Sequence, residues 1–188
     1  MADIVLDSLR RRLRSMHSLW EDAVATMTLE QVNYVERDPI LPIAFSLFHF
    51  VQIEDGSGTI LGAGPMIYNS ARGEQMGLAV MDNGKERTVA EMMAQRIGDY
   101  GAFQDYMAEV FAKTEKWLAD LDPASLSDVI VARPLPENLA STFSARVAGD
   151  EGITRLVGLE CWIYQHGLRH MGEIEHARAL VGLEGMTS

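Results

Sequence analysis

Cysteine is almost absent, because Cys161 is the only one in 188 residues. A single cysteine excludes an intramolecular disulfide framework and fits a reducing compartment. The first fifteen residues contain no apolar run of signal-peptide length, and no segment approaches the roughly 18 apolar residues that a membrane span needs. We therefore expect a cytoplasmic protein that does not insert into a membrane.

Positive charge is also scarce. The chain has 16 Lys and Arg against 27 Asp and Glu, a formal net charge of −11. Nucleic-acid binding depends on clustered cations, so this balance argues against nucleic acid as a partner. The one basic run, residues 10–14, alternates with Leu9 and Leu13 at helical spacing, which favours the solvated face of a helix. We expect a small-molecule substrate instead.

Apolar residues recur at helical spacing in three segments, near residues 2–28, 88–121 and 150–181. A further segment, 42–55, is apolar nearly all round; its length and the Pro at its start favour a buried helix, and a strand is the alternative. The connections between them, 56–87 and 122–150, are rich in Gly or Pro, and the apolar run from Val129 to Val131 suggests a short strand or a helical turn. The glycines in GSGTILGAGP lack the ending of a phosphate-binding loop. With no repeat and no internal boundary, residues 1–188 are expected to form one all-α domain, a four-helix bundle with long connections after its second and third helices.

Three histidines carry the chemical signal. His166 and His170 stand four residues apart in the last helical segment, so both imidazoles lie on one face and can reach one metal ion. His49 lies between Phe48 and Phe50 in the second segment, and a buried imidazole needs partners for its nitrogens. Facing helices of a bundle would bring His49 to the pair. A core histidine bonded to a neighbouring helix explains His49 equally well at this level.

The other histidines and the cysteine are given plainer roles. His17 follows Met16 at the edge of the first apolar stripe and is expected to make one hydrogen bond at the core boundary. His176 is about 600° around the helix from His170 and is expected at the surface. Cys161 is expected to be a buried, unreactive thiol.

These residues resemble the DinB/YfiT-like superfamily of metal-dependent helical-bundle proteins. The resemblance rests on His49 in FSLFHFVQIED and on HGLRHMGEI, which begins at His166 and has Glu173 where the family often has Gln. It implies that His49, His166 and His170 bind a divalent metal such as zinc, nickel or iron. It also implies similarity to transferases that use a low-molecular-weight thiol, such as bacillithiol or mycothiol, and to a maleylpyruvate isomerase.

The function expected from sequence is therefore a metal-dependent enzyme, a thiol S-transferase or a hydrolase of small electrophiles. Glu160 and Glu173 are the candidate catalytic carboxylates, with Glu54 a further acidic residue. A salt bridge at the edge of the core is the alternative for Glu160. Glu173 could instead orient a ligand, join the metal's coordination shell or be an exposed helix charge. Eleven methionines in an apolar bundle are consistent with a homodimer face. The alternative is a non-catalytic, stress-related bundle that serves as a binding or dimerisation module.

Overall fold

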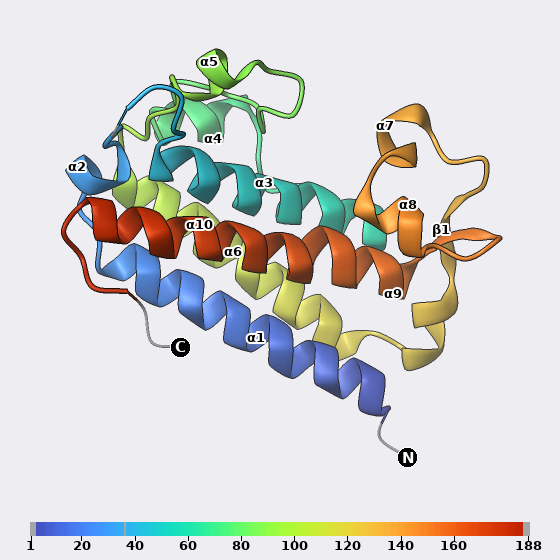
Figure 1. The fold of residues 1–188 in the computed structure, drawn as a ribbon. Helices are drawn as coiled ribbons and strands as arrows, with labels where there is room; N and C mark the ends of the chain where they lie inside the picture. The colour runs from blue at the N-terminus through green and yellow to red at the C-terminus, as the bar shows by residue number, and fades with distance from the viewer. Residues whose placement is uncertain (1–2, 36, 186–188) are drawn as a thin grey trace.

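Four long helices lie side by side and enclose the core in the computed structural model, which describes residues 3–35 and 37–185 (Figure 1). They are α1 (Ile4–Ala25), α3 (Ile43–Leu61), α6 (Tyr100–Asp120) and α10 (Gln165–Leu180). Helices α1 and α3 each contact both α6 and α10. The expectation of a predominantly helical fold is thus confirmed. Among the described helices, none is long and apolar enough to cross a membrane.

Helix α1 forms because its apolar residues keep one stripe. Asp3 caps its first turn by accepting a hydrogen bond from the Leu6 backbone N–H at 2.9 Å. The stripe is fully or almost fully buried and consists of Leu6, Leu9, Leu13, Met16 and Trp20. The predicted start at residue 2 lies outside the described residues, and the helix ends at Ala25 rather than at residue 28.

Helix α3 is apolar nearly all round because it is covered on nearly every side. Helices α6 and α10 pack against it, and the connection that follows it folds back over it (Figure 1). The helix runs six residues beyond the predicted end at Asp55, and Gly62 ends it with φ of 102°. The first glycines of the predicted loop therefore belong to the helix, where Gly58 is buried.

Short elements fill the two connections. The first holds α4 (Ser70–Gln75) and α5 (Val89–Met92), and α2 (Leu29–Val32) precedes α3. The second holds a 3-10 helix η1 (Pro123–Ser127), β1 (Val129–Ala132), α7 (Glu137–Ala140), α8 (Phe143–Val147) and β2 (Gly152–Thr154). Strands β1 and β2 pair antiparallel, with Val131 opposite Ile153, so of the two alternatives for residues 129–131 the structure shows the strand.

The prediction of one helix over residues 88–121 is wrong. Helix α5 ends at Met92, and α6 begins only at Tyr100. Between them Gly98 packs against Gly77, where a Cβ on Gly98 would lie 3.2 Å from the Gly77 Cα, and Asp99 then caps α6 through the Ala102 N–H. The close backbone approach breaks the helix although the apolar spacing continues through this segment.

The last helical run also starts later than residues 150–151. Residues 152–154 form β2, and Thr154 caps the new helix by accepting from the Val157 N–H at 3.3 Å. The run is α9 (Arg155–Gly158), a π-helical turn η2 (Leu159–Tyr164) and then α10. The π-helical turn is a feature that apolar spacing does not reveal.

Candidate metal centre

The structure brings the three predicted histidines together between α3 and α10. The Nε2 atoms of His49 and His166 are 3.2 Å apart, and those of His166 and His170 are 3.0 Å apart. One ligand nitrogen from each residue lies within 4.8 Å of the others, and all three side chains are half-buried. The sequence signal therefore identified a real spatial cluster.

The other ring nitrogen of His49 is fixed by the first connection. Its Nδ1 lies 2.5 Å from the carbonyl oxygen of Asn83, and because a carbonyl only accepts, Nδ1 carries the proton. The turn that presents this carbonyl is held by Asp82, which accepts from the Gly84 N–H and pairs with Arg87. The Nε2 of His49 therefore has a free lone pair in the neutral ring.

The other ring nitrogen of His170 is fixed by an acidic residue on its own helix. Its Nδ1 lies 2.7 Å from Glu173 Oε2, and the Ser46 hydroxyl donates to the same oxygen at 3.0 Å. The hydrogen bond from His170 is the main reason that the pKa of Glu173 is lowered, so the carboxylate accepts and His170 Nδ1 donates. The Nε2 of a neutral His170 then also presents a lone pair.

These tautomers leave an electrostatic conflict at the centre of the cluster. The lone pairs of His49 Nε2 and His170 Nε2 both face His166 Nε2. A proton on His166 Nε2 can be donated to only one of them, so one lone pair remains unsatisfied. A cation at the centre would satisfy all three nitrogens.

The donor set fits a divalent metal ion. Two nitrogens bound about 2.0–2.1 Å from one tetrahedral zinc lie about 3.3 Å apart, close to the observed separations of 3.0 and 3.2 Å. The partners on the second ring nitrogens of His49 and His170 are of the kind that orient metal-bound histidines, a backbone carbonyl and a carboxylate. The three histidines could thus hold a metal ion.

Burial keeps two of the imidazoles neutral. It lowers the pKa of His49 to about 4 and that of His166 to about 2. Neutral imidazole is the form that binds a metal. The Nδ1 of His166 is buried with no hydrogen-bond partner among the described residues, and this holds for either tautomer of that ring.

Two local features place His166. The π-helical turn η2 ends immediately before α10, one residue ahead of His166. Gly167 then lets the helix approach its neighbours, because a Cβ there would lie 2.3 Å from Met16 Sδ and 2.7 Å from Phe50 Cζ. The site therefore depends on close packing between α10, α1 and α3.

Of the three acidic residues singled out from the sequence, only Glu173 contacts the histidine cluster. Glu160 pairs with Arg12 at 3.6 Å, and the structure gives it no hydrogen bond to the three histidines. Glu54 is fully buried against His17. Glu173 alone touches the cluster. His176 is exposed, as expected. Cys161 is buried, and this burial is the main reason that the pKa of its thiol is raised to about 11.

The expectation for His17 is wrong. It is fully buried rather than at the core boundary, its Nδ1 lies 2.8 Å from Glu115 Oε1, and its Nε2 lies 3.2 Å from Glu54 Oε1. Its ring stacks on Phe111 with centroids 4.0 Å apart. The signal that could have found this network is the acidic pair Glu54 and Asp55 in an otherwise apolar helix.

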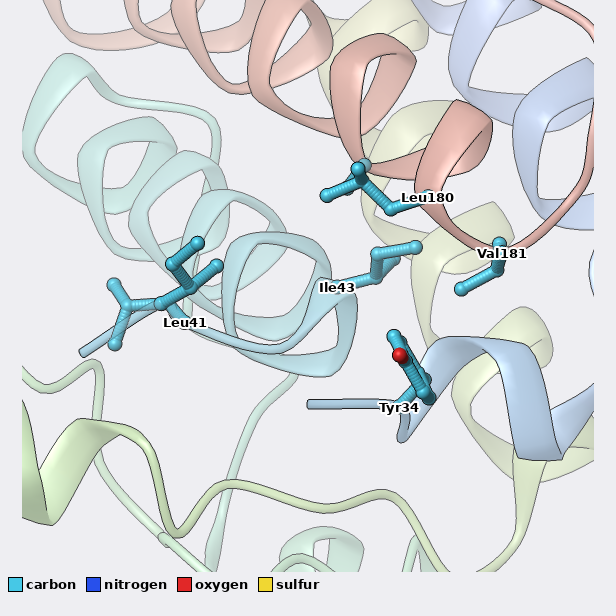
Figure 2. A pocket seen from close by; sticks show the side chains of 7 residues that line it. Tyr34, Leu41, Ile43, Leu180 and Val181 are labelled. Carbon is cyan, nitrogen blue, oxygen red and sulfur yellow. The ribbon is translucent and has the colours of Figure 1, made fainter. Parts of the chain in front are cut away.

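A shallow apolar hollow lies elsewhere on the molecule, between the segment after α2 and the last turns of α10 (Figure 2). Figure 2 shows Leu41 at the left, Leu180 above, Val181 at the right and Tyr34 below, with Ile43 between them. Its lining has no His, Cys or acidic side chain. The hollow therefore shares no residue with the histidine cluster.

Comparison with known proteins supports the fold alone. No protein-family model matches the chain, and no curated protein sequence matches it. A solved structure described as the crystal structure of the conserved protein of locus from Enterococcus faecalis is similar, with a TM-score of 0.73 and 21% identity over 96% of this chain and 98% of that one. At this identity the similarity concerns the arrangement of the helices.

Proposed function

We propose that the chain is a DinB/YfiT-like four-helix bundle whose His49, His166 and His170 bind a divalent metal ion in an enzyme site. One observation carries the proposal: the three Nε2 atoms converge while the Nδ1 atoms of His49 and His170 are already committed to a carbonyl and a carboxylate. Such second partners orient ligands and raise their basicity. Three neutral protein ligands leave coordination positions for a substrate.

The chemistry that a bound metal supplies is activation of a water or thiol by lowering its pKa. The protein residues orient the metal ligands. Asn83 and Glu173 hold two imidazoles in one tautomer, and Ser46 restrains the Glu173 carboxylate. Glu173 is also the acidic group nearest the cluster that can take up a proton. We assign the reaction to transfer of a low-molecular-weight thiol or to hydrolysis of a small electrophile, in keeping with the resemblance of the histidine motifs.

The metal test uses full-length protein purified without an affinity tag. Elemental analysis should find about one zinc, nickel or iron per chain. His49→Ala and His166→Ala should each lose the metal, because two imidazoles hold a divalent ion far more weakly than three. His176→Ala, on the exposed side of the same helix, is the matched control and should keep it. Full occupancy in either site variant would reject this ligand set.

A non-catalytic bundle is the second candidate. It is favoured by the fact that hydrogen bonds from Asn83 and Glu173 already hold His49 and His170 without any added group. This interpretation predicts protein that contains no stoichiometric metal and a modest loss of stability on His→Ala substitution. If the protein does contain metal, assays with thiols and electrophiles, run with and without chelator, would separate a transferase from a hydrolase.

A further inference from the structure

A free guanidinium flanks the histidine cluster. Arg169 lies on α10 between His166 and His170, about 60° around the helix axis and about 4.5 Å along it from His166. The buried face of this helix, with Met171 and Ile174, turns the other way. Arg169 is exposed and so occupies the solvent side of the cluster.

One carboxylate oxygen of the residue at the pairing position of Arg169, Glu173 Oε2, already accepts two hydrogen bonds. Glu173 follows Arg169 by four residues, the spacing at which an arginine and a glutamate pair on a helix. The Glu173 carboxylate instead accepts hydrogen bonds from His170 and Ser46. Within residues 3–35 and 37–185, none of the ion pairs involves Arg169.

The positive charge of Arg169 reaches the cluster. Arg169 follows His166 by three residues and precedes His170 by one, so its Cα lies within about one helical turn of both. Helix α10 packs against α3, which carries His49, so the guanidinium belongs to the same interface as the cluster. A ligand at the cluster would therefore lie in the field of this guanidinium.

We propose that Arg169 binds a carboxylate of the small molecule that the three-histidine site takes, so that the substrate or thiol is an acidic molecule. The inference rests on the proposed function and specifies its substrate class. A guanidinium offers a planar pair of N–H donors that matches a carboxylate. The chain's net charge of −11 repels anions at long range, so a local cation is needed to hold one. The neighbouring Glu173 carboxylate disfavours a dianion such as a phosphate monoester more than a monoanion.

The test measures binding rather than turnover. Full-length protein loaded with cobalt(II) is titrated with 3-mercaptopropionate, which carries a carboxylate, and with the neutral thiol 2-mercaptoethanol, and the thiolate-to-cobalt absorption band reports each Kd. The ratio of the two Kd values is compared between proteins, which cancels the difference in thiol acidity. Arg169→Gln should raise the Kd for 3-mercaptopropionate by about tenfold relative to the Kd for 2-mercaptoethanol, a factor that corresponds to about 1.4 kcal/mol. Arg169→Glu should weaken it further.

Arg11→Gln is the matched control, because Arg11 is exposed on α1 and makes no ion pair within the described part of the chain. It changes the net charge equally and should leave the ratio unchanged. An unchanged ratio in Arg169→Gln, or an equal change in Arg11→Gln, would overturn the assignment of Arg169 while cobalt binding still supports the metal site. Failure to bind cobalt would overturn the metal site and the Arg169 proposal together.

Discussion

Removing the His17 imidazole should destabilise the protein severely. Glu54 and Glu115 are hydrogen-bond acceptors, so both ring nitrogens of His17 donate and the ring is a buried imidazolium. Only Glu54 Oε2 has hydrogen-bond geometry to Nε2, at 3.3 Å, and Oε1 is buried without such a bond. His17→Ala would leave Glu54, which is fully buried, without its cation. Breaking a buried ion pair from one side costs about 3–5 kcal/mol.

The assay is urea and thermal unfolding of metal-free protein at pH 6. For a chain of this size, about 3–5 kcal/mol corresponds to a fall in Tm of about 6–20 °C. His176→Ala, which removes an exposed imidazole, should change the free energy of unfolding by less than about 0.5 kcal/mol. A loss below about 1 kcal/mol in His17→Ala would refute the reasoning, because it would mean that Glu54 does not need this cation.

A second substitution separates the charge from the packing. His17→Leu alone should be strongly destabilising, whereas His17→Leu combined with Glu54→Leu should recover most of the loss. Replacing both members of a buried pair by apolar residues is often neutral. If the double variant is as unstable as the single one, the lost stacking on Phe111 rather than the unpaired carboxylate is the cause.

The pH dependence has a definite sign. Burial opposes protonation of His17, but the charge of Glu54 and the hydrogen bonds to Glu54 and Glu115 outweigh it and raise the pKa above 6.5. The His17 contribution is therefore complete below pH 6.5 and is lost as the pH rises through the folded-state pKa. Burial likewise opposes ionisation of Glu115, yet hydrogen bonds from His17 and Arg14 lower its pKa below 4.5, so that contribution is lost in acid. The stability difference between wild type and His17→Gln should be largest between pH 4.5 and 6.5, and growth of that difference above pH 6.5 would contradict the charge assignment.

Three further predictions concern packing and the metal centre. Gly167→Ala should cost about 1–3 kcal/mol in urea unfolding because its Cβ meets the Phe50 ring, whereas Gly172→Ala, with open space around it, should be neutral or stabilise the same helix by up to about 1 kcal/mol. Glu173→Ala should weaken metal binding by about 10–100-fold in chelator competition, since it frees the ring of His170. Asp55→Ala should lower the free energy of unfolding by about 3–5 kcal/mol, because the buried carboxylate pairs with a lysine and two backbone N–H groups.

The parts of the site that follow helical periodicity could be predicted from sequence. His166 and His170 share a face by spacing alone, and His49 is expected opposite them because its apolar segment has to be buried among other helices. The partners of the second ring nitrogens could not be predicted in this way. The Asn83 carbonyl is a backbone group in a turn, and Ser46 reaches Glu173 only across the packed interface.

The errors in the predicted fold also arise from contacts between residues that are far apart in the sequence. The apolar period of residues 88–121 continues through the break before Tyr100, so periodicity alone merges α5 and α6. Asp99 carries a capping signal, but the contact of Gly98 with Gly77 joins positions twenty-one apart and has no local pattern. The spacing around His17 in its own helix does not reveal its burial, because its carboxylate partners come from two other helices, α3 and α6.

Helix α3 links the histidine cluster to the long connection that follows it. Near its middle, His49 donates to the Asn83 carbonyl, and six residues on, Asp55 accepts from the Ile67 and Tyr68 N–H groups. The connection is thus tied to α3 at both ends, once by a metal-ligand candidate and once by a buried carboxylate. A metal bound at Nε2 would hold the proton on the Nδ1 that donates to Asn83 and so would stabilise this hydrogen bond. We therefore expect hydrogen exchange of the Gly84 and Lys85 amides, in the turn at residues 82–87, to slow when metal is added.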